Sequence, residues 1–226
     1  MKLQAQSAWR GQVNGAVGAE DMSRRERRGS ETRERLFSAA MDLFRERGFH
    51  NTTVEDITNA ADVGKGTFFN YFPSKEHILS VLGQVQVAKY DKAAEIAQSQ
   101  NARAAIHWLF HAIPAESGSS VKMVRSLFTV FLTSEAVRDF LTAGLATGRS
   151  KLEQIFSEGQ RRREIPSQAD PADLAVRFQQ SLFGCMFLWT LQTLQTPPPP
   201  LEKWLDDGFD FFWSGVNAPP AVRSES

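Results

Sequence analysis

Residues 52–75 read TTVEDITNAADVGKGTFFNYFPSK and predict two short helices joined by a tight turn. Thr53 suits the N-cap of the first helix, and Asp56 stands three residues later, as in a capping box. This helix is expected to end at Asp62, where the turn begins. Its apolar stripe is predicted to consist of Val54, Ile57, Ala60 and Ala61.

The second helix is predicted to begin at Lys65 and to stop before Pro73, because proline cannot continue a helix. Phe68 and Phe72 are four residues apart and should therefore face inward together. The outer face that remains is unusual for a core helix and typical of a helix that reads DNA. This face consists of Lys65, Gly66, Thr67, Phe69, Asn70 and Tyr71.

Together with the preceding stretch TRERLFSAAMDLFRERGF at residues 32–49, this segment resembles the DNA-binding domain of the TetR family of bacterial regulators. The resemblance covers about 45 residues of continuous pattern. It implies that residues 54–61 form the supporting helix, that residues 65–72 form the recognition helix, and that Lys75 opens the helix leading to a ligand-binding domain. The implied DNA-binding residues are Thr53, Lys65, Gly66, Thr67, Phe69, Asn70, Tyr71 and Lys75, with phosphate anchored by Thr53, Tyr71 and Lys75.

Three residues depart from the usual pattern of that family. Asp62 stands where glycine is common in the turn, yet aspartate tolerates a left-handed backbone better than most residues. Gly64 replaces a frequent serine cap, at an expected cost of a few tenths of a kcal/mol. Phe69 replaces a frequent tyrosine, and its ring can still press on a thymine methyl group or a sugar.

The composition indicates a cytoplasmic helical protein. The 226 residues are 42% hydrophobic, enough for a substantial core, and the single cysteine rules out an intrachain disulfide framework. The longest apolar run, at residues 182–189, is too short to span a bilayer, so no membrane segment is expected. The net charge is zero, but residues 22–75 carry ten Lys or Arg against eight Asp or Glu.

Residues 1–29 lack periodicity and are predicted to form a disordered leader. They end in a basic cluster, which is either a DNA-binding arm that tracks phosphate or part of a solvated leader. Met22 stands just before this cluster, so translation starts at either Met1 or Met22. The cluster consists of Arg24, Arg25, Arg27 and Arg28.

The predicted fold class is all-α. A first regular helix from Ser30 to a stop at Gly48 opens a three-helix helix-turn-helix domain at residues 30–75, and residues 76–216 form a larger helical domain for ligand binding and dimerisation. Residues 217–226 are expected to be a disordered tail. The core of the first domain is predicted to contain Phe37, Phe44, Phe49, Phe68 and Phe72. Roughly six helices are expected after Lys75, with breaks near Ser99, residues 114–120, Ser134, residues 166–171 and residues 197–200.

The last two helices are predicted to form a homodimer interface. Residues 172–195 are apolar nearly all round, so this helix needs cover from its own domain and from a second subunit. Gly184 and Cys185 would permit close helix approach. The alternative is that both helices pack within one subunit. A two-fold dimer presents recognition helices to successive major grooves, so the expected partner is a palindromic double-stranded DNA operator.

The first functional hypothesis is a ligand-responsive repressor, which a small apolar or aromatic effector releases from DNA by population shift. The alternative is a DNA-binding structural adaptor with a protein partner and no effector pocket. Candidate pocket residues are bulky side chains of the middle helices, each of which also suits a plain core position. These are Trp108, Phe110, His111, Met123, Phe128, Phe131, Phe183, Met186 and Phe187.

His107 and His111 are four residues apart and share a helix face, as two metal ligands or an effector anchor would. The sequence places no carboxylate or cysteine beside them at ligand spacing, so hydrogen-bonded or solvent-facing histidines are the default interpretation. Neither a metal nor another cofactor is expected. An enzyme with one of these histidines as base is a third hypothesis, but no nucleophile, metal cluster or phosphate-binding loop supports it, so the protein is not expected to be an enzyme.

Overall fold

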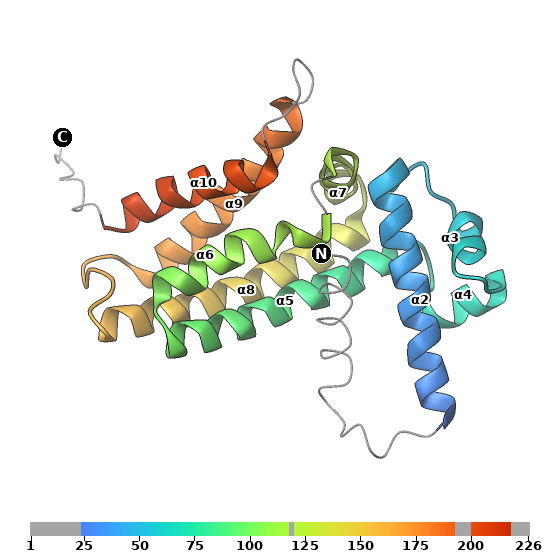
Figure 1. Cartoon of the computed structure of the whole chain (residues 1–226), viewed down its shortest axis with the longest axis horizontal. Coiled ribbons are helices and arrows are strands. Elements are labelled where there is room, and N and C mark those ends of the chain that lie inside the picture. Colours follow the sequence, from blue (N-terminus) through green and yellow to red (C-terminus); the bar gives the residue numbers. More distant parts are fainter. Residues whose placement is uncertain (1–23, 118–119, 193–199, 218–226) are drawn as a thin grey trace. The chain divides into compact units, whose positions relative to one another are not determined.

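The structure of the chain is a computed structural model that describes residues 24–117, 120–192 and 200–217. Within these ranges it contains nine α-helices, one short 3-10 helix and no strand (Figure 1). The predicted all-α class with an N-terminal helix-turn-helix is therefore confirmed. Among the described helices, none combines the length and the apolar character that a bilayer span requires.

The chain folds into two compact units. Unit 1 lies within Met1–Ala88 and Glu116–Leu141, and unit 2 lies within Lys89–Ala115 and Thr142–Ser226. This division differs from the predicted boundary at residue 75, because a second stretch of chain joins the N-terminal helices. Two long helices pass from one unit into the other: α5 (Glu76–Ser99) and α8 (Glu135–Arg161).

Unit 1 opens with α2 (Arg24–Arg47), which begins earlier than the expected Ser30. Residues 24–29 are thus helical and do not belong to a disordered leader. Gly48 ends this helix at φ 86°, a backbone conformation in which glycine is favoured, as predicted. Residues 1–23, which include Met22, and residues 218–226 of the predicted tail lie outside the described part of the chain.

Two short helices, α3 (Val54–Ala60) and α4 (Lys65–Tyr71), complete the helix-turn-helix. Their inner faces close a core with α2 in which Phe44, Phe49, Phe68 and Phe72 are at most 3% exposed, and Phe37 packs partly buried against it. The predicted stripe of α3 is wrong at Ala60, which is exposed. Thr58 is buried instead, and its hydroxyl donates to the Glu55 carbonyl at 3.0 Å, so its burial leaves no hydrogen bond unmade.

The helix α7 (Val121–Thr133) belongs to unit 1, although the sequence placed it in the larger domain. Its N-cap Ser120 donates a hydrogen bond to the Arg45 carbonyl at the end of α2, at 2.7 Å. The Ser126 hydroxyl accepts from the Phe49 backbone N–H at 3.1 Å. These bonds join residues more than seventy positions apart, and they tie α7 to the C-terminal end of α2.

Unit 2 is built from helices that meet around an aromatic core. Phe110 is fully buried and lies with its ring centroid 5.2 Å from that of Phe178, 5.7 Å from Phe209 and 6.1 Å from Phe212. The six helices that follow Lys75 in the described residues agree with the expected number. The helices that contribute only to unit 2 are α6 (Ala102–Ala112), α9 (Pro171–Gln192) and α10 (Leu201–Val216), and the 3-10 helix η1 (Pro114–Ser117) lies at the boundary.

The helices α9 and α10 approach each other closely within unit 2. A Cβ atom added at Gly208 would lie 2.4 Å from the Cys185 sulfur, so a larger residue here would force the Cys185 side chain or the helices to shift. The Trp204 indole N–H donates to the Cys185 carbonyl at 2.9 Å. Gly184, which was predicted to share this role, has no atom within 4 Å of an added Cβ. The close approach therefore depends on a glycine of α10.

Candidate nucleic-acid interface

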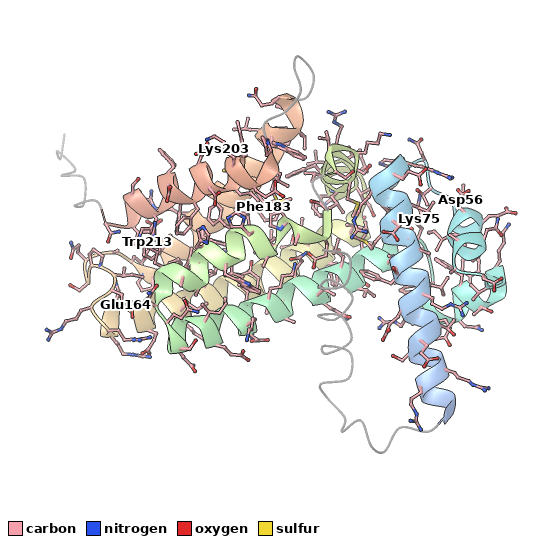
Figure 2. All side chains as sticks on the ribbon, viewed as in Figure 1. Asp56, Lys75, Glu164, Phe183, Lys203 and Trp213 are labelled. Atoms are coloured by element: carbon pink, nitrogen blue, oxygen red, sulfur yellow. The ribbon has the colours of Figure 1, made fainter. Side chains whose placement is uncertain are left out.

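The supporting helix α3 begins with the predicted capping box. The Asp56 backbone N–H donates to the Thr53 hydroxyl at 3.1 Å, and the Thr53 hydroxyl and N–H both donate to the Asp56 carboxylate, at 2.6 and 2.8 Å (Figure 2). These hydrogen bonds, together with the charge of Arg47, lower the pKa of Asp56. The capping role of Thr53 is confirmed, and its predicted contact with phosphate stays a prediction.

The turn between α3 and α4 is held from outside by an arginine that the sequence reasoning missed. Asp62 adopts the predicted left-handed conformation, at φ 52°. The Arg35 guanidinium of α2 donates to the carbonyls of Ala61 and Asp62, at 2.5 and 3.1 Å. It therefore satisfies carbonyls at the C-terminal end of α3 and links the turn to α2.

The predicted recognition helix α4 has one buried and one exposed face. Phe68 is fully buried, whereas its neighbour Phe69 is 54% exposed. Lys65 forms a 2.8 Å ion pair with Glu55 of α3, and both side chains are exposed. Because such surface pairs are worth at most about 1 kcal/mol, a phosphate group can compete for this ammonium. The outer face also carries Gly64, Gly66 and Asn70, which are exposed, and Thr67 and Tyr71, which are half-buried.

Lys75 lies in a different environment from the one that a phosphate anchor needs. Its ammonium donates to the carbonyls of Phe49 and Thr52, both at 2.7 Å, and stands 4.1 Å from the centre of the Phe49 ring (Figure 2). Burial lowers the pKa of this lysine. Two of its three N–H groups are thus used inside unit 1. Lys75 therefore contributes to the stability of unit 1, and its predicted contact with phosphate stays a prediction.

The N-terminal end of α2 runs past the recognition helix. A Cβ atom added at Gly29 would lie 3.4 Å from the Tyr71 hydroxyl. Arg27 and Arg28, both exposed, lie within one helical turn of this contact. The structure therefore places Gly29, near the start of α2, next to Tyr71 of α4, and the phosphate-tracking arm stays a prediction.

The sequence model of the family described as "Bacterial regulatory proteins, tetR family" matches residues 36–82, which contain the whole arrangement of α3 and α4. This part of the chain is a TetR-family DNA-binding domain. The "HTH-type transcriptional regulator TcmR" of Streptomyces glaucescens is 43% identical over 54 residues, which are 24% of this chain and 24% of TcmR. The matches to the first curated relatives span only 22–30% of their lengths.

Two solved structures of TetR-family proteins resemble this chain over most of its length. A TetR-family regulator from Syntrophomonas wolfei has a TM-score of 0.66 at 18% identity and covers 86% of this chain and 99% of its own. Thermus thermophilus FadR, a TetR-family repressor in complex with lauroyl-CoA, has a TM-score of 0.58 at 24% identity and covers 86% and 100%. At these identities the likeness establishes the fold of both parts of the chain.

The nine candidate effector residues are divided between the two units. Met123 and Phe131 pack in or against the core of unit 1, and Phe128 lies on the same helix α7. Phe110 belongs to the aromatic core of unit 2. The remaining candidates lie on α6 and α9 of unit 2, with Met186 buried, Trp108, His111 and Phe183 half-buried, and Phe187 exposed.

An open groove of about 450 Å³ lies along α5 and α6 in unit 2. Trp108 is the one candidate effector residue among its lining residues, and the polar groups of Gln100, Arg103 and His107 also line it. The groove combines the indole of Trp108 with polar groups, so it would suit an aromatic ligand that also carries polar atoms.

Proposed function

We propose that this chain is a TetR-family transcriptional regulator that binds an operator as a homodimer and is released from it by a small apolar or aromatic ligand. The observation that carries the proposal is the outer face of α4, where an exposed phenylalanine stands beside exposed polar groups on a helix whose inner face is fully packed. A short helix held rigidly from behind, with such a face turned to solvent, fits the major groove.

The side chains of α4 divide into base-reading and phosphate-binding groups. Asn70 is exposed, and its amide suits a bidentate contact with adenine, while the hydroxyl and methyl of Thr67 suit several base edges. Phe69 would press on a thymine methyl group. Phosphate would be bound by Lys65 and by the arginines at the start of α2, through charge and without reading sequence.

The second copy in the proposed homodimer would cover an apolar face that the described chain leaves exposed. On α9, Phe187, Leu188 and Leu191 are 44–51% exposed, and on α10 Phe211 is 80% exposed. The opposite face of α10, which includes Phe209 and the residues around it, packs within its own subunit. The interface would therefore use the outer faces of these two helices, as in a two-fold bundle.

Release by an effector would act through the helices that both units share. A ligand that changes the packing of unit 2 would bias the position of α5 and α8, each of which continues into unit 1. The ligand can shift this equilibrium only by its difference in affinity for the two states. The lauroyl-CoA bound to Thermus FadR joins an apolar acyl chain to a charged CoA group, so it supports an effector with a large apolar part. DNA binding that no small molecule changes would instead favour the adaptor function.

Substitutions on α4 should separate base reading from phosphate binding. Thr67→Ala and Asn70→Ala are each expected to cost about 1–3 kcal/mol on the preferred duplex and little on duplexes altered at the contacted base pair. Lys65→Ala should weaken binding to all duplexes alike and reduce the salt slope by about 1. Fluorescence titrations over a panel of duplexes and salt concentrations measure both effects.

A matched control removes the ion pair but keeps the lysine. Glu55→Gln leaves Lys65 free of its partner and should retain or raise affinity for every duplex. If all three substitutions on α4 lower affinity by the same factor on every sequence, the assignment of Thr67 and Asn70 to base reading is wrong.

A further inference from the structure

The fold places a carboxylate beside the histidine pair of α6. The sequence did not reveal this carboxylate. The helices α6 and α10 lie side by side in unit 2 (Figure 1). Asp206 of α10 places its Oδ1 atom 2.9 Å from His111 Nε2 and 3.5 Å from His107 Nε2. Two imidazoles one helical turn apart thus present the same ring nitrogen to one oxygen. From this convergence we infer that His107, His111 and Asp206 form a binding site for a divalent transition-metal ion.

The distances suit such an ion. Zn²⁺ binds imidazole nitrogen and carboxylate oxygen at about 2.0–2.2 Å, so tetrahedral ligand atoms stand about 3.3 Å apart. The two histidine-to-aspartate distances lie on either side of this value, and all three ligand atoms lie within 4.8 Å of one another. The side chains are between 30% and 53% exposed. Small rotations of the side chains therefore complete the geometry, and water can reach the open coordination positions.

The basic groups nearest to Asp206 have their closest ion pairs with other carboxylates, although the charge of Asp206 also acts on Lys203. Arg103, one turn before His107, is 3.4 Å from Asp210, and its guanidinium lies over the Phe209 ring. Lys203 is held by Asp207 at 2.9 Å. The edge of the His107 ring packs against Phe209 at 4.7 Å between centroids, which restrains the ring orientation. A cation at the site thus meets a carboxylate whose adjacent basic groups have carboxylate partners of their own.

The donor set indicates which ions bind. Two imidazoles and one carboxylate favour Zn²⁺, Ni²⁺, Cu²⁺ or Co²⁺, whereas Mg²⁺ and Ca²⁺ require mostly oxygen ligands. Three protein ligands with open positions resemble an open zinc site more than a closed structural one. A bound ion would link α6 to α10. The inference does not depend on the proposed function, because metal binding is measured without DNA.

The test is calorimetric titration of the untagged full-length protein with ZnCl₂, NiCl₂ and MgCl₂. We expect one Zn²⁺ or Ni²⁺ per chain and no binding of Mg²⁺. His111→Gln and Asp206→Asn should each weaken Zn²⁺ binding more than about 100-fold, because loss of a direct ligand exceeds the 10–100-fold effect of outer-shell partners. Both side chains are partly exposed, so the variants should melt like the parent protein without metal.

The chain supplies its own control in its two other histidines. The double variant His50→Gln/His77→Gln retains the proposed site and should bind Zn²⁺ with unchanged affinity. The inference is overturned if the parent protein binds neither Zn²⁺ nor Ni²⁺. It is equally overturned if Asp206→Asn and His111→Gln bind Zn²⁺ as tightly as the parent.

Discussion

Replacing Phe68 by alanine is expected to unfold the DNA-binding domain and to abolish DNA binding. The side chain is fully buried between α4 and the rest of the core, with its ring centroid 5.6 Å from that of Phe72. Truncation of a buried phenylalanine costs about 3–5 kcal/mol, because the apolar contacts are lost and a cavity remains. Small domains are stable by about 5–15 kcal/mol in total, so this loss is severe. Thermal unfolding followed by circular dichroism measures it.

The next residue provides a matched control for this experiment. Phe69 is the same residue type on the same helix, but it is 54% exposed. Phe69→Ala should change the free energy of unfolding by less than about 0.5 kcal/mol. It should weaken DNA binding by about 1 kcal/mol, roughly fivefold, through the apolar area that the ring would bury against DNA. Equal destabilisation by both substitutions, or full DNA affinity of Phe68→Ala, would contradict the assignment of the two faces.

Removing the ammonium of Lys75 is expected to destabilise unit 1 by about 2–3 kcal/mol. A hydrogen bond to a charged group is worth about 1.5–3 kcal/mol, and Lys75 makes two of them. Only part of their total stabilisation is lost, because water can replace the ammonium at a partly buried site. The substitution Lys75→Met keeps the aliphatic stem against Phe49 and leaves the carbonyls of Phe49 and Thr52 without this donor. Urea unfolding of unit 1, followed by circular dichroism, gives the change in free energy.

Lys65 is the matched control for Lys75. Its exposed pair with Glu55 is worth at most about 1 kcal/mol, so Lys65→Met should leave the stability almost unchanged and should reduce the salt slope of DNA binding. If instead Lys75→Met retains full stability and alone reduces the salt slope of DNA binding, Lys75 is the phosphate anchor that the family resemblance implies.

Sequence reasoning succeeded where the signal is local. The capping box of Thr53 and Asp56, the left-handed Asp62 and the stop at Gly48 each depend on backbone conformations that a few neighbouring residues determine. The inward pair Phe68 and Phe72 follows from helical spacing alone. These features were sufficient to place α3 and α4 and the outer face of the predicted recognition helix.

The features that the sequence did not reveal are contacts between distant parts of the chain. Arg35 reaches a turn 26 residues away, and Asp206 lies 95 residues from His111. Residue spacing along one helix carries no information about such pairs, because the packing of two helices brings them together. The same limit applies to α7, whose composition alone does not show that it joins the core of unit 1.

The candidate effector residues illustrate a second limit of prediction from the sequence. Phe110 and Phe183 are both aromatic residues on predicted helices, but the first is fully buried in an aromatic core and the second is half-buried. Hydrophobic composition cannot separate a filled core from a ligand cavity, because both require the same side chains. The prediction of an apolar effector therefore depends on the proposal for the whole chain and not on the individual residues.

The central claim is that the exposed face of α4 reads a specific DNA sequence in a two-fold dimer. Selection of random double-stranded DNA by the purified full-length protein at physiological salt, followed by sequencing of the retained duplexes, tests it most directly. The account predicts an enriched palindrome whose half-sites are about one helical turn apart. Retention of duplexes without any enriched sequence would show that the chain binds phosphate only, and it would contradict the claim.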